Sequence, residues 1–369
     1  MATSQRLPRI VRGLGSVLPR SLDALRQSAE WHGASPAAAR QLGEIMVDEL
    51  TLTAMTLLAP APILARPLSA CAPAAEELTA LGIDAAHAEP EPLQTRTIGR
   101  HRFGRVCYER LTFDHDPLLP PSLQAEHLGG PARATVHLCR HRGAPRPWLV
   151  WVHGAGQGNG SDLMVARVQR LHRLGFNVAL PIQPGHGVRR DAWPAYPGHD
   201  PLANVAGTMR AISEVRAVVR WLRPQATSVT VAGISLGSPV AALVSHLETG
   251  VDAVAVYTPI AGLNAMVARH LWRWGAGGET VGEALRSPTA AALMSVVDPL
   301  ATDPAPPADR RLIVAARHDA MAYPETAVAL QQRWGGRLFW HEGGHVGHIF
   351  SRRVQAETER FLCEAIGGG

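Results

Sequence analysis

Apolar runs and longer helical patterns alternate along the chain from about residue 95 onward. The apolar runs predict strands at 105–113, 134–139, 148–153, 177–182, 229–234, 251–257, 311–316 and 337–341. Helical spacing predicts helices at 162–174, 205–222, 239–247, 325–334 and 346–366. This alternation favours an α/β fold in which helices cover a mostly parallel sheet.

The first 94 residues have a helical pattern instead. Ser21 is positioned to cap one helix, and Ser35 followed by Pro36 predicts the start of another. Apolar residues after that cap fall at helical spacing and predict one buried stripe: Leu42, Ile45, Met46 and Leu50. Prolines then interrupt the helix, and the segment 89–92 predicts a linker. We therefore divide the chain into an N-terminal helical segment, 1–94, and a domain, 95–369, with an insertion at about 260–308.

Composition describes an ordinary globular protein, with 46% hydrophobic and 18% charged residues over 369 positions. The net charge of +5 comes from arginine, because the chain has no lysine. No basic cluster with interleaved aromatic residues is present, which argues against nucleic-acid binding. Residues 1–30 carry a net charge of +3, which favours at most weak contact with a membrane surface. Packing against the second domain, or a dimer contact, is the simpler interpretation of this segment.

The cysteines are scattered without C-x-x-C spacing, at Cys71, Cys107, Cys139 and Cys363. This favours free thiols in a reducing compartment. Residues 1–20 lack the continuous apolar core of a secretory signal, and the apolar stretch 50–65 is too short and too interrupted to span a bilayer. We therefore expect a cytoplasmic protein.

The segment Gly233-Ile-Ser235-Leu-Gly237 follows an apolar strand and runs into an apolar helical pattern. In a strand–turn–helix elbow of the form G-x-S-x-G, the serine backbone is strained and its hydroxyl projects from the sheet edge. The two glycines remove side chains that would collide there. Ser235 is the candidate nucleophile, and the backbone N–H of Leu236 is a candidate oxyanion donor at a helix N-terminus.

A serine nucleophile needs a base within hydrogen-bond reach and an acid that orients the base. Asp319 follows the predicted strand 311–316, and His345 lies on a glycine-rich turn after the strand 337–341. A second oxyanion donor is predicted at the backbone N–H of Ala155, in the small-residue loop 153–156. His153 is interpreted as a structural residue that orients this loop.

Residues from about 95 to 366 resemble the α/β-hydrolase superfamily, in particular its serine esterases and lipases. The resemblance rests on the elbow, the His-Gly-Ala-Gly loop at 153–156, the Pro-Gly-His-Gly turn at 184–187 and the Gly-Gly-His sequence at 343–345. The order Ser235, Asp319, His345 is also that of the superfamily. The resemblance implies an eight-stranded, mostly parallel sheet with helices on both faces, and an acyl-enzyme mechanism that needs no metal or organic cofactor.

Several residues have rivals or simpler interpretations. His348 competes with His345, but its place in a predicted helix favours a packing role. His341, His345 and His348 are disfavoured as a metal cluster, because no carboxylate or cysteine lies at ligand spacing. Asp298 and Asp303 are expected in surface turns rather than as the acid.

The insertion has the composition of an apolar lid, although core packing beneath a long loop explains it nearly as well: Leu271, Trp272, Trp274 and Met294, with interspersed glycines. Trp193 and Tyr196 are candidates for the opposite wall. We predict a serine hydrolase that cleaves a small-molecule carboxylic ester with an apolar acyl group. Thioester or amide cleavage, acyl transfer, and a non-catalytic module that binds a ligand or partner remain alternatives.

Overall fold

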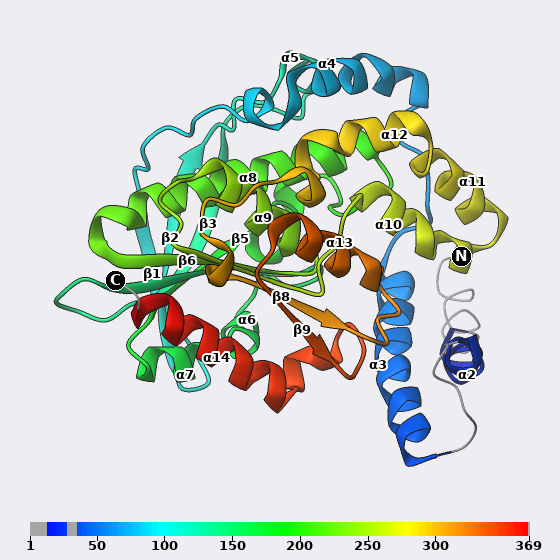
Figure 1. The fold of residues 1–369 in the computed structure, drawn as a ribbon. Coiled ribbons are helices and arrows are strands. Elements are labelled where there is room, and N and C mark those ends of the chain that lie inside the picture. The colour runs from blue at the N-terminus through cyan, green and yellow to red at the C-terminus, as the bar shows by residue number, and fades with distance from the viewer. Residues whose placement is uncertain (1–12, 28–34, 368–369) are drawn as a thin grey trace.

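A computed structural model of the chain describes residues 13–27 and 35–367 (Figure 1). Within these ranges the strands form one nine-stranded sheet in the order β1-β2-β3-β5-β4-β6-β7-β8-β9. The strand bounds are β1 Arg96–Phe103, β2 Val106–His115, β3 Ala132–Cys139, β4 Arg146–Val152, β5 Asn177–Ile182, β6 Ala226–Ile234, β7 Ala253–Tyr257, β8 Arg311–Ala316 and β9 Arg337–His341.

From β5 to β9 in this order, each strand pairs in parallel with its neighbour. The pairs β1 with β2, β2 with β3 and β3 with β5 are antiparallel. The eight predicted strands are present as β2 to β9. The sequence did not predict β1, because its eight residues lack a buried apolar face. This edge strand joins the sheet by backbone pairing with β2 through a turn at Gly104, whose φ of 57° suits glycine.

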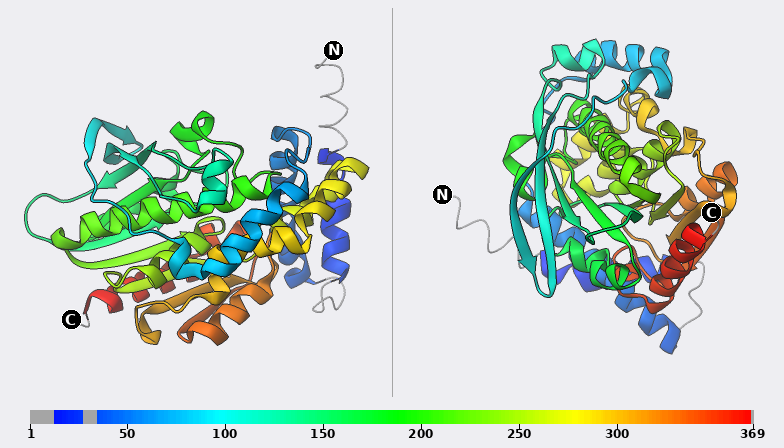
Figure 2. Two further views of the ribbon diagram at one scale, coloured as in Figure 1. Left: turned by 90° about the horizontal axis from the view of Figure 1, so that it is seen from above. Right: turned by 90° about the vertical axis from the view of Figure 1, so that its left-hand side faces the viewer.

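Helices flank both faces of the sheet (Figures 1 and 2). On one side lie α8 (Pro201–Leu222), α9 (Gly237–Leu247) and α13 (Pro324–Trp334), and on the other lie α6 (Asp162–Val165), α7 (Val168–Arg173) and α14 (Arg352–Gly367).

Two predicted helices differ from the structure in their bounds. The helix expected at 162–174 is divided at Arg167, whose φ is 52°. The helix expected from residue 346 begins at Arg352, after the 3₁₀ turn Gly347–Phe350.

The expected insertion consists of short helices, with α10 (Leu263–His270), α11 (Ala276–Leu285) and α12 (Pro288–Leu293) as its α-helical parts. The short helix α5 (Pro121–Ala125) and the helix α4 (Leu68–Ala86) lie nearby, and Figure 2 shows α4 alongside α12. Cys71 and Leu78 of α4 are fully buried in the same core as α8 and α9. The N-terminal segment therefore contributes to the main core.

Of the remaining N-terminal helices, α3 (Pro36–Leu58) lies at the carboxyl ends of β8 and β9, with α2 (Val17–Gln27) beside it (Figure 1). As predicted, Ser35 caps α3, its hydroxyl accepting the Ala38 N–H at 3.1 Å. The cap predicted at Ser21 is wrong, because Ser21 lies inside α2 and its hydroxyl donates to the Val17 carbonyl at 2.8 Å. The predicted apolar stripe is partly wrong, because Leu50 is 44% exposed. The buried face instead includes Asp48 and Glu49, since it meets polar loops rather than an apolar core.

All four cysteines are unpaired. No helix in the described part of the chain has the length and apolarity needed to cross a membrane.

Candidate active site

Ser235 lies at the turn between β6 and α9 and has a φ of 51°, in the left-handed region that costs a non-glycine residue about 1–3 kcal/mol. A Cβ on Gly233 would lie 2.1 Å from the carbonyl oxygen of Gly237, and one on Gly237 would lie 2.2 Å from that of Val152. Both flanking positions therefore require glycine. The Ser235 N–H donates to the Tyr257 carbonyl at 2.9 Å, which ties the turn to β7.

The structure brings the three predicted side chains into one hydrogen-bonded chain. The Oγ of Ser235 lies 2.9 Å from Nε2 of His345, and Nδ1 of His345 lies 2.7 Å from Oδ2 of Asp319. The other Asp319 oxygen accepts the N–H groups of Met321 and Ala322 at 2.9 and 2.7 Å. With its proton on Nδ1, the imidazole donates to the carboxylate and offers Nε2 to the hydroxyl.

Charges around the imidazole favour its protonated form. Burial lowers the pKa of His345, but the Asp319 carboxylate, its hydrogen bond and the Asp48 carboxylate together raise that pKa above its ordinary value. Burial raises the pKa of Asp319, but the facing His345 and the two backbone N–H groups hold it below its usual value. The arrangement can thus accept a proton from the serine hydroxyl and stabilise the resulting imidazolium.

The two predicted oxyanion donors lie close to Ser235. Leu236 occupies the N-cap position of α9, and Ala155 follows Gly154, where a Cβ would lie 3.5 Å from the Cβ of Ser235. Across the described ranges neither the Leu236 nor the Ala155 N–H has a protein acceptor. Both N–H groups are therefore free to serve a ligand.

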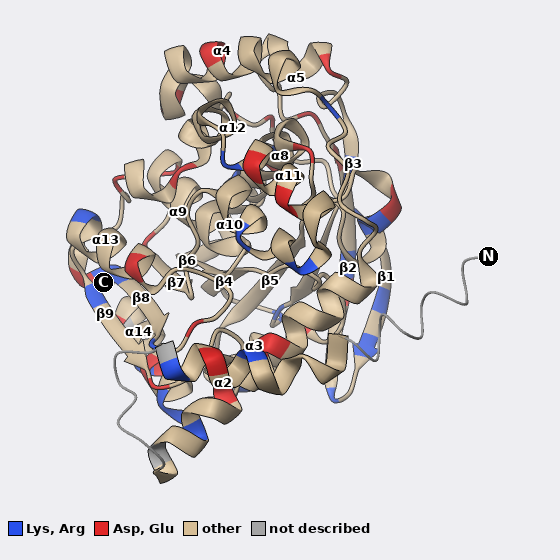
Figure 3. Ribbon diagram, turned by 90° about the vertical axis from the view of Figure 1, so that its right-hand side faces the viewer, with Lys and Arg blue, Asp and Glu red and all other residues tan. Residues whose placement is uncertain are grey.

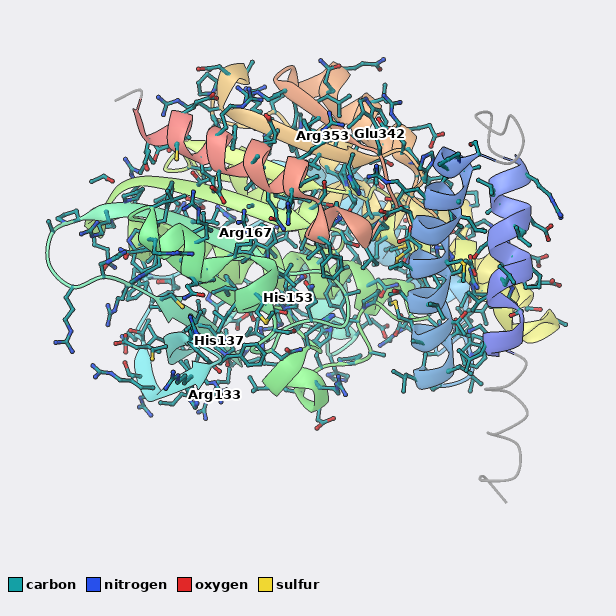
Figure 4. The ribbon with its side chains drawn as sticks, turned by 90° about the horizontal axis from the view of Figure 1, so that it is seen from below. Arg133, His137, His153, Arg167, Glu342 and Arg353 are labelled. Atoms are coloured by element: carbon teal, nitrogen blue, oxygen red, sulfur yellow. The ribbon has the colours of Figure 1, made fainter. Side chains whose placement is uncertain are left out.

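His153 holds the loop that carries Ala155. It is buried in the middle of the molecule (Figure 4), and its Nε2 accepts the Gln183 N–H at 3.1 Å. Burial lowers its pKa to about 3, so the ring is a neutral acceptor at physiological pH. The Gln183 amide also donates to the His153 carbonyl at 2.5 Å. The structural role predicted for His153 agrees with these contacts.

A mostly apolar cavity of about 150 Å³ opens beside Ser235 and His345. Its walls come from three parts of the chain: Leu52, Met55 and Thr56 of α3; Met266, Leu271 and Trp274 of the insertion; and Pro197 and His199 after β5.

Some predicted wall residues lie elsewhere. Trp272 is 48% exposed beneath two arginines, Met294 belongs to the core, and the buried Tyr196 contacts Thr208. Trp193 packs against Arg210.

The rival residues have other partners. Nδ1 of the buried His348 lies 2.5 Å from the His345 carbonyl oxygen. His318, which precedes Asp319 in the chain, accepts from the Gln41 amide at 3.0 Å. Asp298 accepts the Leu300 N–H, and Asp303 pairs with Arg333. Among residues 13–27 and 35–367, no three His, Cys, Asp or Glu side chains are grouped to hold a metal ion.

Sequence reasoning missed Asp48, which approaches this site from α3. Its carboxylate accepts the N–H groups of Ala320, His345 and Val346. The sequence holds one weak signal, an acidic residue within the helical stripe defined by Ile45 and Leu52.

No family model matches the chain. Its fold is similar to that of an acetyl xylan esterase from Paenibacillus sp. R4, with a TM-score of 0.51, 16% identity and coverage of 82% of this chain and 96% of that one. Acetyl xylan esterase 1 from Thermoanaerobacterium sp. JW/SL YS485 gives the same TM-score at 14% identity, with coverage of 83% and 95%. The chain therefore has the α/β-hydrolase fold of these two esterases.

Two uncharacterised proteins of Mycobacterium tuberculosis are more similar in sequence, MT2702 of strain CDC 1551 / Oshkosh and Rv2627c of strain ATCC 25618 / H37Rv. Each is 32% identical over 292 residues, which cover 76% of this chain and 68% of the relative. The chain belongs to the same family as these two proteins.

Proposed function

We propose that this protein is a serine hydrolase that cleaves a carboxylic ester through an acyl-enzyme intermediate. The observation that carries the proposal is the hydrogen-bonded chain from Ser235 through His345 to Asp319. The same three residue types, in the same roles, perform acyl transfer on several unrelated folds.

In the first half of the reaction, Oγ of Ser235 attacks the acyl carbonyl carbon as its proton passes to Nε2 of His345. Asp319 stabilises the imidazolium, and the N–H groups of Leu236 and Ala155 bind the oxyanion. When the tetrahedral intermediate collapses, the bond to the leaving alcohol breaks and the alcohol takes the proton from His345. In the second half, His345 accepts a proton from water, the hydroxide attacks the acyl-enzyme, and the proton returns to Ser235 as the acid departs.

The size and lining of the cavity favour a substrate with a small apolar acyl group. Its volume of about 150 Å³ is similar to that of an apolar protein cavity that holds one benzene ring. Short aliphatic chains or a single small ring therefore fit better than long fatty acyl chains. The acetyl xylan esterases of similar fold are named for cleavage of a short acyl ester, which agrees with this size.

Hydrolysis of 4-nitrophenyl acetate and butyrate by the purified chain tests the proposal. Ser235→Ala is expected to lower kcat by at least about 10³-fold, because the nucleophile is lost. Ser245→Ala is the matched control, since its buried hydroxyl lies on the same helix α9 and donates only to the Ala242 carbonyl. Equal turnover by wild type and Ser235→Ala contradicts the proposed nucleophile. No turnover by folded wild type, on esters or on thioesters and amides, favours a binding protein.

A further inference from the structure

Asp48 is a fully buried carboxylate that the reaction described above does not use. One of its oxygens accepts the N–H groups of His345 at 2.7 Å and Ala320 at 3.1 Å, and the other accepts the N–H of Val346 at 2.9 Å. Ala320 directly follows Asp319. One side chain of α3 therefore joins the loop that carries the acid to the loop that carries the base.

The glycines of the histidine loop make room for this contact. A Cβ on Gly344 would lie 2.8 Å from Oδ2 of Asp48, and one on Gly347 would lie 1.9 Å from Oε2 of Glu44. Glu44, one helical turn before Asp48, accepts the Gly344 N–H at 3.3 Å. The glycine-rich turn is thus shaped around two acidic side chains of α3, and Figure 3 shows acidic residues on this helix.

We propose that Asp48 is a positioning residue for the serine hydrolase reaction, and that it fixes the loops of Asp319 and His345 relative to Ser235. This inference rests on the proposed function. It makes α3 part of the active site, in agreement with the cavity wall formed by Leu52, Met55 and Thr56 of the same helix.

The charges around Asp48 support a second effect on the base. Burial raises the pKa of Asp48 to about 6, while His345 and the backbone N–H groups lower it and Asp319 raises it further. Glu44 is the acidic neighbour on its own helix. When ionised, Asp48 raises the pKa of His345. Replacing Asp48 with asparagine removes this charge and turns an amide NH₂ toward backbone donors, so both position and charge change.

Steady-state hydrolysis of 4-nitrophenyl butyrate against pH, by the full chain, tests the proposal. Asp48→Asn is expected to lower kcat by about 10- to 100-fold, because a displacement of about 1 Å between base and nucleophile has an effect of that size. KM is expected to stay within about twofold, since Asp48 does not line the cavity. The acid limb of kcat/KM is expected to move to lower pH.

Two further variants on α3 show whether the loss of kcat follows the strength of the contact with the histidine loop. Glu44→Gln is expected to reduce kcat less, because Glu44 accepts one longer hydrogen bond. Leu50→Ala, on the exposed side of α3, is expected to leave kcat unchanged. Thermal unfolding checks that each variant is folded. If Asp48→Asn does not fold, Gly344→Ala tests the same contact from the opposite side, and an unchanged kcat in that folded variant overturns the proposal.

The imidazole pKa of His345 gives a readout that does not need turnover. It is measured by NMR on the full chain with ¹³C-labelled histidine, and the His345 signal is assigned by its loss in His345→Asn. A lower His345 pKa in Asp48→Asn than in wild type is expected. Unchanged kcat and unchanged His345 pKa in folded Asp48→Asn overturn the role of Asp48 alone. Wild type that lacks turnover on every acyl donor overturns the proposed function, and this inference with it.

Discussion

Ser235 has a left-handed backbone conformation, and its hydroxyl meets Nε2 of His345 at 2.9 Å. The strain is tolerated because the turn is held from both sides, by the Tyr257 carbonyl and by the close approach of Gly237 to β4. At this scale the sequence was informative. The G-x-S-x-G spacing is read directly from neighbouring residues, so no long-range contact is needed to predict the elbow.

The pH dependence of kcat/KM follows from His345. The base must be neutral to accept the Ser235 proton, and the Asp319 carboxylate, its hydrogen bond and Asp48 raise the His345 pKa above its ordinary value despite burial. We therefore expect kcat/KM for 4-nitrophenyl acetate to fall as the pH drops, with a midpoint above the ordinary pKa of a histidine side chain. Initial rates measured across a pH series in buffers of constant ionic strength give this midpoint.

Asp319→Asn provides the comparison for that profile. The substitution removes the charge that faces His345, so the midpoint is expected to shift to lower pH, and kcat is expected to fall by up to about 10⁴-fold as the imidazole loses its orienting partner. A wild-type profile that does not fall as the pH drops through the ordinary pKa range of histidine would mean that His345 is not the titrating base.

The strand and helix on either side of the elbow were predicted well, because the spacing of apolar residues and the glycines at turns can be recognised from neighbouring residues alone. The edge strand β1 was not, since Arg96, Arg100 and Arg102 give it no apolar alternation and only its pairing with β2 defines it. The orientation of α3 was also missed in part. Its buried face is set by contacts with the loops after β8 and β9, which lie 272 and 297 residues further along the chain.

Gly237→Ala tests the contact between the elbow and β4. The added methyl group would lie 2.2 Å from the backbone oxygen of Val152, which no side-chain motion relieves. We expect a loss of about 1–3 kcal/mol in the free energy of unfolding, the usual effect of overpacking. Urea unfolding followed by tryptophan fluorescence measures it.

Gly277→Ala is the matched control, because a Cβ at this helical position in α11 meets no atom within 4 Å. It is expected to be neutral or to stabilise the protein by up to about 1 kcal/mol. If both variants unfold at the same urea concentration as wild type, the elbow is not packed as described.

The whole molecule assembles its cavity from segments that no local pattern connects. The N-terminal helix α3, the insertion after β7 and the loops at the carboxyl ends of the strands each contribute a wall. The sequence predicted the hydrolase fold and the three polar residues, but it left residues 1–94 without a role. Such a role depends on tertiary contacts of α3, and the division of the chain at residue 94 stays a prediction.

Trp274→Ala tests whether the insertion sets the acyl length. Trp274 lines the cavity of about 150 Å³, and its removal enlarges the space beside Ser235. The ratio of kcat/KM for 4-nitrophenyl octanoate to that for the acetate is expected to rise by about tenfold, since one or two extra buried methylene groups are worth about 1–3 kcal/mol. Trp272→Ala, on the exposed side, should leave the ratio unchanged. An unchanged ratio in Trp274→Ala would place the acyl group elsewhere.

Reaction of the folded chain with a fluorophosphonate, followed by digestion and peptide mass spectrometry, shows whether Ser235 is an activated nucleophile. The probe reacts with a serine only when a neighbouring base activates it. We expect one adduct, on the peptide that contains Ser235, formed by wild type and at least about 10²-fold more slowly by His345→Ala. No adduct on the folded wild type, or an adduct on another serine with Ser235 unmodified, would contradict it.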